Sequence, residues 1–411
     1  MSEDGPAADQ APPSPDDPEA ASAVTRVAVV TLPPDPSTSE SAHPTRADWR
    51  YGAAVTLLTR LIFLPLGYAA HWYFSGAKGA PGGLALDVWT HWDAGILLRI
   101  AEYGYTPRAG THLTAYFPAF PLAVRLVAAT GVSYVVAGLV VNTVACTVAF
   151  SYLSALGRRE LGSTGGRRAV LYLALFPTAV FLVAPYTEPL FIAGAIAAFF
   201  YARSRQWRFV ALPAAVAVGA RLLGLALVAG LGVEFLHQRD FRRRQVRAAT
   251  LALGAGCLPF LAYAAYLWRA RGNPLFFVTD ERLGWGRHFV GPVAALRTTL
   301  NSRLWAYLGS NYVLAMRLEV IAAVAGVGFT AWAVVRRQYG YATFMALTMA
   351  ALVTSSWYYS IPRALLTLFP IPLLLASFTG RGQHRHDAVI AAFSAVAAFG
   401  VVAFTTGAWF F

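Results

Sequence analysis

The chain has 411 residues, of which 57% are hydrophobic and only 13% are charged. Soluble domains carry about 25% charged residues, so this composition excludes an ordinary soluble enzyme. A formal net charge of +13 would favour nucleic acid as a partner of a soluble protein. Here the arginines lie between long apolar runs, as membrane topology requires. We therefore predict an all-α polytopic membrane protein that contacts membrane lipids and no nucleic acid.

The first fifty residues differ in composition from the rest of the chain. They hold nine of the twenty acidic residues, three arginines and many prolines, alanines and serines. Such a segment buries too little apolar surface to offset its ordering entropy. We expect a disordered cytoplasmic tail over 1–50 and a multi-span membrane domain over 51–411. A cleaved signal peptide is not expected, because no basic stretch precedes a short apolar run there.

Clusters of basic residues predict the topology, because Lys and Arg are retained on the cytoplasmic side and an even number of crossings must separate neighbouring clusters. Apolar runs of about 20 residues span a bilayer. The clusters lie near residues 46–50, 158–168, 203–208, 239–247, 336–337 and 381–385. The resulting prediction is about eleven spans. These are one over 53–74, one over 134–156, two each within 169–202, 209–236, 248–335 and 338–380, and a last one over 388–408.

The same topology predicts where the chain turns on the external side. The largest external loop covers residues 75–133, and its apolar segment 119–130 is too short to span, so we expect it at the membrane interface. Further external segments are expected at 184–188, near Arg221, at about 270–311 and at 357–363. The external face thereby collects most of the acidic residues outside the tail.

The sequence gives little sign of metal or disulfide chemistry. Cys146 and Cys257 lie in apolar runs and are expected to pack as small hydrophobes. No cluster of His and Asp has ligand spacing, so we assign no metal ligands, take no cofactor as certain, and leave a divalent metal possible. Lys78 is the single lysine among many arginines. This usage indicates a GC-rich bacterial genome and hence the plasma membrane.

Residues 91–105 form the most informative segment of the chain. Its apolar residues fall on one helical face, and Arg99 and Glu102 fall on another. Gly104 suits the position just past a helix C-terminus. We predict a short amphipathic helix lying flat on the outer leaflet, with Asp93 at its N-terminus, where the helix dipole favours a carboxylate. The alternative is that Asp93 only caps this helix.

Three further charged residues are predicted at the external surface. Glu188 lies where two spans meet, between Pro185 and Pro189. An acid between apolar runs is costly unless paired and is often functional; the alternative is that it simply begins the next helix. Arg363 offers a planar fork for a phosphate, or else reaches the lipid head groups. Arg221 lies at the turn between two short spans.

Motifs in chain order then give a family resemblance over about 88–380. The chain resembles the PIG-V type of membrane mannosyltransferase, whose eukaryotic members add the second mannose to GPI anchors. The resemblance implies the GT-C glycosyltransferase fold. The matching motifs are Trp92-Asp93-Ala94-Gly95 and residues 100–105, 115–122, 176–179, 184–191, 272–275, 285–287 and 361–363.

The resemblance also implies a reaction. The donor is a polyprenyl-phosphate sugar, with mannose favoured, the acceptor is a lipid or a glycan, and transfer occurs on the outer face with inversion at the anomeric carbon. Asp93 is the expected base and Glu188 the second catalytic residue. The predicted substrate-binding residues are His91, Trp92, Glu102, Tyr116, Tyr186, Arg221, Arg287 and Arg363. Residues 111–113 contribute no acidic partner beside Tyr116.

Two other classes of function compete with this interpretation. A transporter or lipid flippase predicts ionisable groups near the middle of the membrane and two similar halves. The acidic residues instead lie toward one predicted face, and no repeat is evident. A purely structural protein is the third possibility, and the acid-bearing amphipathic helix argues against it.

Overall fold

The computed structural model describes residues 43–74, 85–239, 247–306, 310–380 and 382–410. Apart from one isolated bridge between Phe289 and Ser355, the regular structure within these ranges is helical, which confirms the all-α class. The predicted tail up to residue 42, Lys78 and the basic residues Arg242, Arg243 and Arg244 lie outside them. The helices are α2 (Arg46–Phe74), η1 (Ala85–Trp89), α3 (Asp93–Tyr103), η2 (Leu113–Ala115), α4 (Ala119–Ala128), α5 (Tyr134–Ala174), η3 (Ala179–Leu182), α6 (Glu188–Arg203), η4 (Trp207–Phe209), α7 (Ala211–Ala220), α8 (Gly224–His237), α9 (Arg247–Gly256), α10 (Leu258–Arg271), α11 (Phe276–Trp285), α12 (Pro292–Leu300), α13 (Ser302–Ala306), α14 (Ser310–Val335), α15 (Tyr339–Val353), α16 (Ile361–Thr367), α17 (Pro370–Thr379) and α18 (Gln383–Thr405).

Several helices are long and apolar enough to cross a membrane. In the described residues there are four, namely α2, α5, the Tyr312–Val335 part of α14, and α18. A fifth results if α16 and α17, which meet at a bend of 78°, count as one span. Their outer faces expose large apolar side chains, such as Leu61 at 63% on α2 and Val324 at 69% on α14. Such surface is typical of contact with lipid rather than water.

Other predicted spans are made of shorter helices. The predicted break at Arg221 is present, because α7 ends at Ala220, Arg221 is extended, and α8 begins at Gly224. Ten residues of helix rise about 15 Å, about half the hydrocarbon thickness of a bilayer. Length and composition therefore identify only part of the eleven predicted spans.

Helix α5 doubles back on itself between the basic residues predicted to be cytoplasmic. Gly162 has φ 77° and ψ 171°, so the helix is interrupted there. On either side of the bend the two arms touch, since a Cβ on Gly166 would lie 2.6 Å from the backbone nitrogen of Arg158. Glycine suits the positive φ at position 162, and glycine at position 166 allows the two arms to approach without a Cβ between them.

Helix α6 lies inside the bundle. All of its residues except Leu190 and Arg203 are buried, and α5, α7 and α8 pack against it. At Gly194 the backbones of α6 and α7 nearly touch, because an added Cβ would lie 2.6 Å from the carbonyl oxygen of Pro213. This contact brings the end of α7 beside the beginning of α6.

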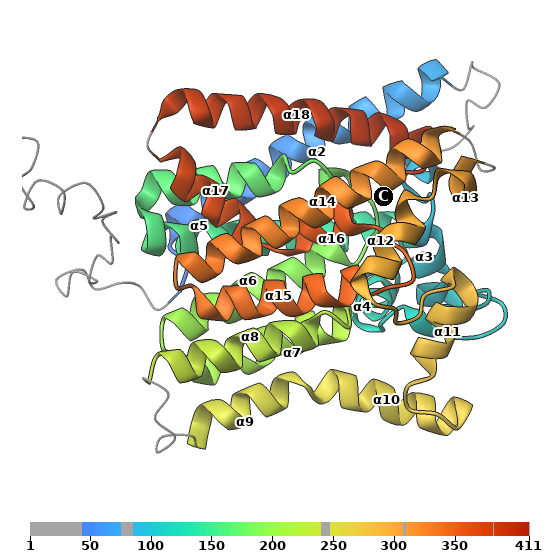
Figure 1. Cartoon of the computed structure of the whole chain (residues 1–411), viewed down its shortest axis with the longest axis horizontal. Helices are drawn as coiled ribbons and strands as arrows, with labels where there is room; N and C mark the ends of the chain where they lie inside the picture. The colour runs from blue at the N-terminus through green and yellow to red at the C-terminus, as the bar shows by residue number, and fades with distance from the viewer. Residues whose placement is uncertain (1–42, 75–84, 240–246, 307–309, 381, 411) are drawn as a thin grey trace, which may run out of the picture. The chain divides into compact units, whose positions relative to one another are not determined.

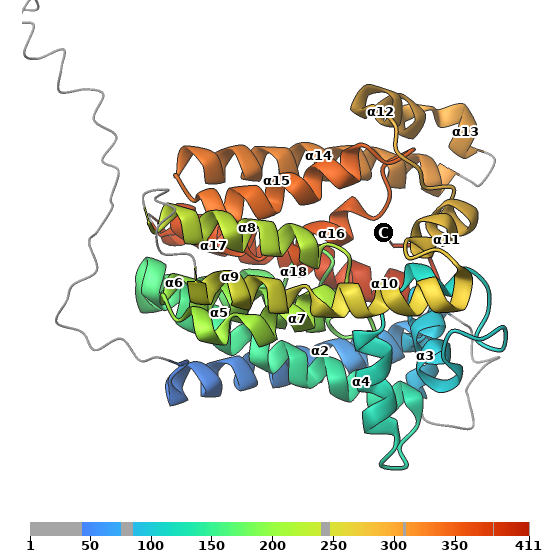
Figure 2. The same ribbon diagram turned by 90° about the horizontal axis from the view of Figure 1, so that it is seen from below.

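The short helices gather at one end of the long ones. Helices α3, α11 and α13 lie on the right in Figures 1 and 2. Helix α4 exposes Leu122 and Leu126 while burying Phe120 and Val124. An apolar exposed face of this kind is typical of the interfacial position predicted for 119–130.

Two sequence predictions need correction. The apolar face of α3 does not face lipid, because Leu97 and Ala101 are 0% and 1% exposed and pack against α4 and α5. The apolar face of α3 is therefore packed inside the protein, and it does not rest on the outer leaflet as predicted. The boundary of the N-terminal tail at residue 50 is also wrong, since α2 begins at Arg46. Asp48 is buried and forms an ion pair with Arg158 at 3.0 Å.

The close contact at Gly194 gives a test of the packing. We expect Gly194→Ala to lower the thermal unfolding midpoint of the purified protein, because overpacking of this kind costs about 1–3 kcal/mol. Gly232→Ala in α8 is the matched control, since its Cβ would meet nothing within 4 Å. Equal midpoints for the two variants would contradict the proposed contact between α6 and α7.

Candidate functional site

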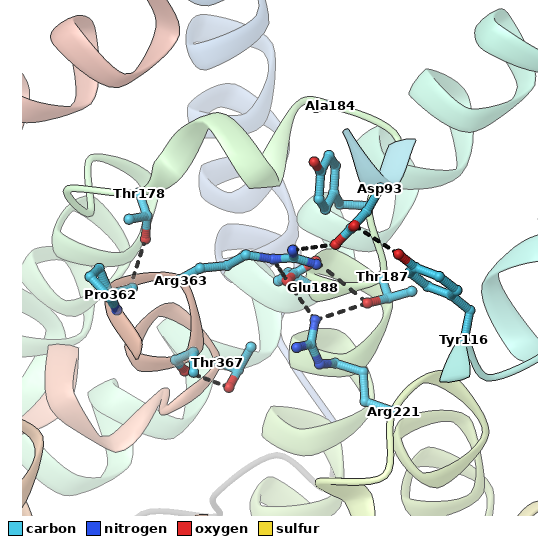
Figure 3. A network of polar contacts seen from close by, with 12 residues as sticks. Asp93, Tyr116, Thr178, Ala184, Thr187, Glu188, Arg221, Pro362, Arg363 and Thr367 are labelled. Atoms are coloured by element: carbon cyan, nitrogen blue, oxygen red, sulfur yellow. Dashed lines mark hydrogen bonds and ion pairs between the residues drawn. The ribbon is translucent and has the colours of Figure 1, made fainter. Parts of the chain in front are cut away.

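Glu188 is the buried centre of a cluster of charged side chains. It is the first residue of α6 and is 0% exposed. Its Oε1 atom accepts hydrogen bonds from Arg363 Nε and, at 2.5 Å, from Arg221 Nη1 (Figure 3). Arg221 Nη1 also donates to Thr187 Oγ1 at 2.9 Å. A buried carboxylate is stable only with such partners, so the fold requires both arginines here.

Asp93 joins this cluster through the same arginine. Arg363 Nη1 donates to Asp93 Oδ2 at 2.6 Å, and the hydroxyl group of Tyr116 donates to Asp93 Oδ1 at 2.8 Å. Asp93 begins α3 and follows Trp92, whose φ is 57°. The carboxylate is thus bound by side chains from distant segments, and the interpretation that Asp93 only caps a helix is wrong.

Aromatic rings cover the other side of Arg363. The guanidinium carbon lies 4.5 Å from the ring centroid of Tyr186 and 5.0 Å from that of Phe181. Cation–π contacts of this kind contribute about 0.5–2 kcal/mol, more when water is excluded. Arg363 is therefore held by Asp93, Glu188 and two rings.

A cavity of about 540 Å³ opens beside this cluster, and we call it the charged cavity. Its volume lies in the range of small-molecule binding sites. Glu188 does not line the cavity but lies behind the arginines. Charged and aromatic side chains on its wall include Asp93, Tyr116, Arg221, Glu281, Arg287 and Arg363.

Burial raises the pKa of two groups on this wall. Burial, together with the negative charge of Asp93, holds the pKa of Tyr116 well above its ordinary value. Tyr116 therefore remains a hydrogen-bond donor. Burial also raises the pKa of Glu281, and the charge of Asp93 adds to the effect, although Arg287 at 3.7 Å opposes it.

An acidic residue from α11 holds the segment that carries Tyr116. Asp280 Oδ2 accepts hydrogen bonds from the backbone nitrogen of Thr114 at 3.0 Å and from its hydroxyl group at 2.6 Å. The hydroxyl group of Tyr263 donates to the carbonyl oxygen of Thr114 at 2.8 Å. The acidic partner that residues 111–113 do not supply thus comes from 166 positions further along the chain.

A second acidic residue, Glu319 of α14, holds the helix that carries Arg363. It is 0% exposed, and it accepts hydrogen bonds from the backbone nitrogens of Ser360 at 2.8 Å and Ile361 at 2.7 Å. Ser360 has φ 58°, so the chain turns sharply into α16 at this point. Sequence reasoning missed Glu319, whose only signal is an acid within an apolar span.

The segment before Glu188 is held from α2 and α5. Arg60 is buried, and its Nη2 group donates to the carbonyl oxygens of Leu182 at 2.8 Å and Asn142 at 3.2 Å. Asn142 in turn donates to the carbonyl oxygen of Ala184. These bonds satisfy backbone groups that the turn would otherwise leave unpaired inside the protein.

The structure does not bring every predicted site residue to the charged cavity. Trp92 is 46% exposed and Glu102 is exposed, and neither lines the cavity. The ring of His91 packs edge-on against Phe404, and its carbonyl oxygen accepts a hydrogen bond from Tyr186 at 3.3 Å. Tyr186 lies behind Arg363. Asp93, Tyr116, Arg221, Arg287 and Arg363 do line the cavity.

Among the described residues, no group of three or more His, Cys, Asp or Glu side chains is arranged to hold a metal ion. The bonds of Asp93 and Glu188 go to arginine and hydroxyl groups.

Comparison with known proteins confirms the resemblance drawn from the motifs. Residues 83–269 match the family Mannosyltransferase (PIG-V). GPI alpha-1,6-mannosyltransferase 2 of Homo sapiens is 34% identical over 163 residues. That alignment covers 37% of this chain and 31% of the human protein, so the chain spans about a third of the relative that it matches. No solved structure gives a significant match.

The bonds of Glu319 predict a specific loss of stability. Glu319→Ala leaves the buried backbone N–H of Ile361 and the partly buried one of Ser360 without an acceptor, which costs about 1–3 kcal/mol. We expect a lower thermal unfolding midpoint for this variant. Asp387→Ala, which removes an exposed carboxylate from α18, should change stability by less than about 0.5 kcal/mol. A midpoint equal to that of the unsubstituted protein would contradict the role of Glu319 in holding α16.

Proposed function

We propose that this chain, with its match to the PIG-V mannosyltransferases, is a membrane glycosyltransferase. It transfers mannose from a polyprenyl-phosphate donor to a lipid-linked or glycan acceptor, with inversion at the anomeric carbon. The observation that carries the proposal is the charged cavity, where the carboxylate of Asp93 faces the same space as the guanidinium groups of Arg221, Arg287 and Arg363.

Asp93 is the proposed general base. The acceptor hydroxyl group loses its proton to Asp93 as its oxygen attacks the anomeric carbon, and the bond from that carbon to the phosphate oxygen breaks. A positioned base contributes about 10²–10⁴ in rate. A carboxylate offers about four lone-pair sites, so its bonds to Tyr116 and Arg363 leave room for the acceptor hydroxyl group.

Arg221 and Arg363 are the proposed ligands of the donor phosphate. The donor is a phosphodiester with one negative charge, and the leaving polyprenyl phosphate acquires a second one. Positive groups aimed at that developing charge stabilise the transition state. Each guanidinium carries five N–H donors, and the bonds described above leave several of them for a phosphate. Arg287 adds a third positive charge to the wall.

Glu188 then acts as a positioning residue. It does not line the cavity, but its carboxylate bonds to both proposed phosphate ligands. The sequence expectation of a directly catalytic Glu188 is thus replaced by a proposal that it fixes Arg221 and Arg363. In this proposal Asp93 contacts the reacting atoms, and Glu188 contributes by holding Arg221 and Arg363 in position.

We further propose that the chain has the GT-C arrangement, crosses the plasma membrane about eleven times and carries the charged cavity on its outer face. The helix breaks at Gly162 and Arg221 fall where this topology requires turns. The proposed donor has its phosphate at head-group depth, which suits a cavity at the end of the long helices. The transporter or flippase alternative is not favoured by the family match.

The reaction is tested with purified protein, polyprenyl-phosphate-mannose and a membrane lipid extract as the source of acceptor. We expect Asp93→Asn to reduce mannose transfer by about two to four orders of magnitude, because an amide cannot take the proton. Asp87→Asn removes an exposed carboxylate six residues earlier and should retain activity. A folded Asp93→Asn protein with near-normal transfer would eliminate Asp93 as the base.

The orientation is tested by labelling intact cells with a membrane-impermeant thiol reagent. Positions for cysteine must be exposed, as Arg108 and Ser163 are. We expect Arg108→Cys to react from outside, whereas Ser163→Cys, beside the bend of α5, should react only after the cells are opened. The native Cys146 is buried, but Cys257 is partly exposed, so both variants are made together with Cys257→Ala. Reaction of Ser163→Cys in intact cells would reverse the proposed topology.

A further inference from the structure

Helix α11 presents an unusual pair of side chains to the charged cavity. Glu281 and Trp285 lie four residues apart, which places them on one face of the helix, and both line the cavity. The adjacent residue Asp280 is turned away and binds Thr114. The proposed mechanism gives neither Glu281 nor Trp285 a role.

The surroundings of this pair keep it in place. The ring of Trp285 meets the ring of Tyr116 edge-on, with centroids 5.6 Å apart. After α11, Arg287 bonds through Nε to Ser355 at 3.3 Å, and Ser356 donates to the carbonyl oxygen of Gly286 at 3.0 Å. The C-terminal end of α11, which carries Trp285, is thus held in place before any ligand binds.

The chemistry of this face fits a sugar better than a phosphate. One face of a pyranose ring is a patch of C–H groups and its rim carries hydroxyl groups. An indole ring offers a flat apolar surface, and a carboxylate accepts hydrogen bonds from hydroxyl groups. A phosphate at the same place would be repelled by the carboxylates of Glu281 and Asp93.

The position of the pair distinguishes the two sugars of the reaction. Trp285 contacts Tyr116, and the hydroxyl group of Tyr116 binds Asp93. A ring on Trp285 therefore lies beside the proposed base, whereas the donor phosphate lies at Arg221 and Arg363. The sugar beside the base is the one that gives up its hydroxyl proton.

We propose that the cavity face of α11 is the acceptor-sugar subsite, in which Trp285 stacks on the pyranose ring and Glu281 accepts hydrogen bonds from its hydroxyl groups. This inference rests on the proposed glycosyltransferase function. The acceptor therefore ends in a sugar, and a simple lipid alcohol is not its reactive group. Arg287 orients the carboxylate of Glu281 and offsets its charge.

The test measures transfer and hydrolysis separately, again with polyprenyl-phosphate-mannose and a membrane lipid extract. Without acceptor, water takes the place of the hydroxyl group and free mannose is released. We expect Trp285→Ala to raise the amount of extract needed for half-maximal transfer about tenfold or more. The donor KM and the rate of hydrolysis should stay within about twofold. Trp285→Phe should restore part of the acceptor affinity, because it keeps an aromatic plane.

Trp268→Ala is the matched control, since Trp268 lies on α10, is 66% exposed and does not line the charged cavity. Glu281→Gln should also weaken use of the extract, with unchanged donor KM. A rise in donor KM in the Trp285 variants, or an unchanged requirement for extract, would overturn the subsite. An unsubstituted protein that neither transfers nor hydrolyses mannose would instead reject the proposed glycosyltransferase function itself.

Discussion

The structure depends on the burial of one negative charge. Placing the Glu188 carboxylate inside the protein would cost several kcal/mol without partners, so the fold must bring cations to it. Arg221 arrives from the end of α7 and Arg363 from the beginning of α16. Arg363 then reaches Asp93 on α3. A requirement of stability thus assembles the charged cavity, because α6, the end of α7 and α16 must meet around this carboxylate, and α3 joins them through Arg363.

The residues of this cluster share a position at breaks between helices. Asp93 and Glu188 are first residues of their helices, Arg221 follows the last residue of α7, and Arg363 lies in the first turn of α16. Unpaired backbone groups at helix ends need partners inside a membrane. Side chains such as Glu319 and Arg60 supply these partners. The interrupted helices are therefore where polar chemistry is compatible with an apolar surrounding.

Much of this organisation could be predicted from local sequence. Apolar runs, basic clusters and motifs led to the helical class, to the break at Arg221 and to Asp93, Glu188 and Arg363. Residues close to Asp93 in the sequence were also predicted to lie in the site, and three of them do not line the cavity. Glu102 is nine residues from Asp93, and at about 100° per residue it lies on the opposite side of α3. His91 and Trp92 precede the helix, where Trp92 has a positive φ, and neither residue lines the cavity.

The contributions of Asp280 and Glu319 could not be predicted, because their contacts join distant segments. Asp280 binds a backbone group 166 positions earlier, and Glu319 binds one 41 positions later. In the sequence each is an acid without a motif. The proposed role of Glu281 and Trp285 on α11 could not be predicted for the same reason. It depends on Tyr116, which lies far away in the sequence and contacts Trp285 only in the folded protein. Periodicity carries no information on such pairings.

The double ion pair of Arg363 has a consequence for which lipids can enter. A membrane presents phosphate groups in great excess over any rare glycolipid, and an uncovered pair of arginines would bind them indiscriminately. Here Asp93 and Glu188 already occupy these cations, so an incoming phosphate gains little from charge alone. A ligand must add other contacts to compete with these internal anions. A lipid phosphate that binds here must therefore replace or add to the bonds that Arg363 already makes to Asp93 and Glu188.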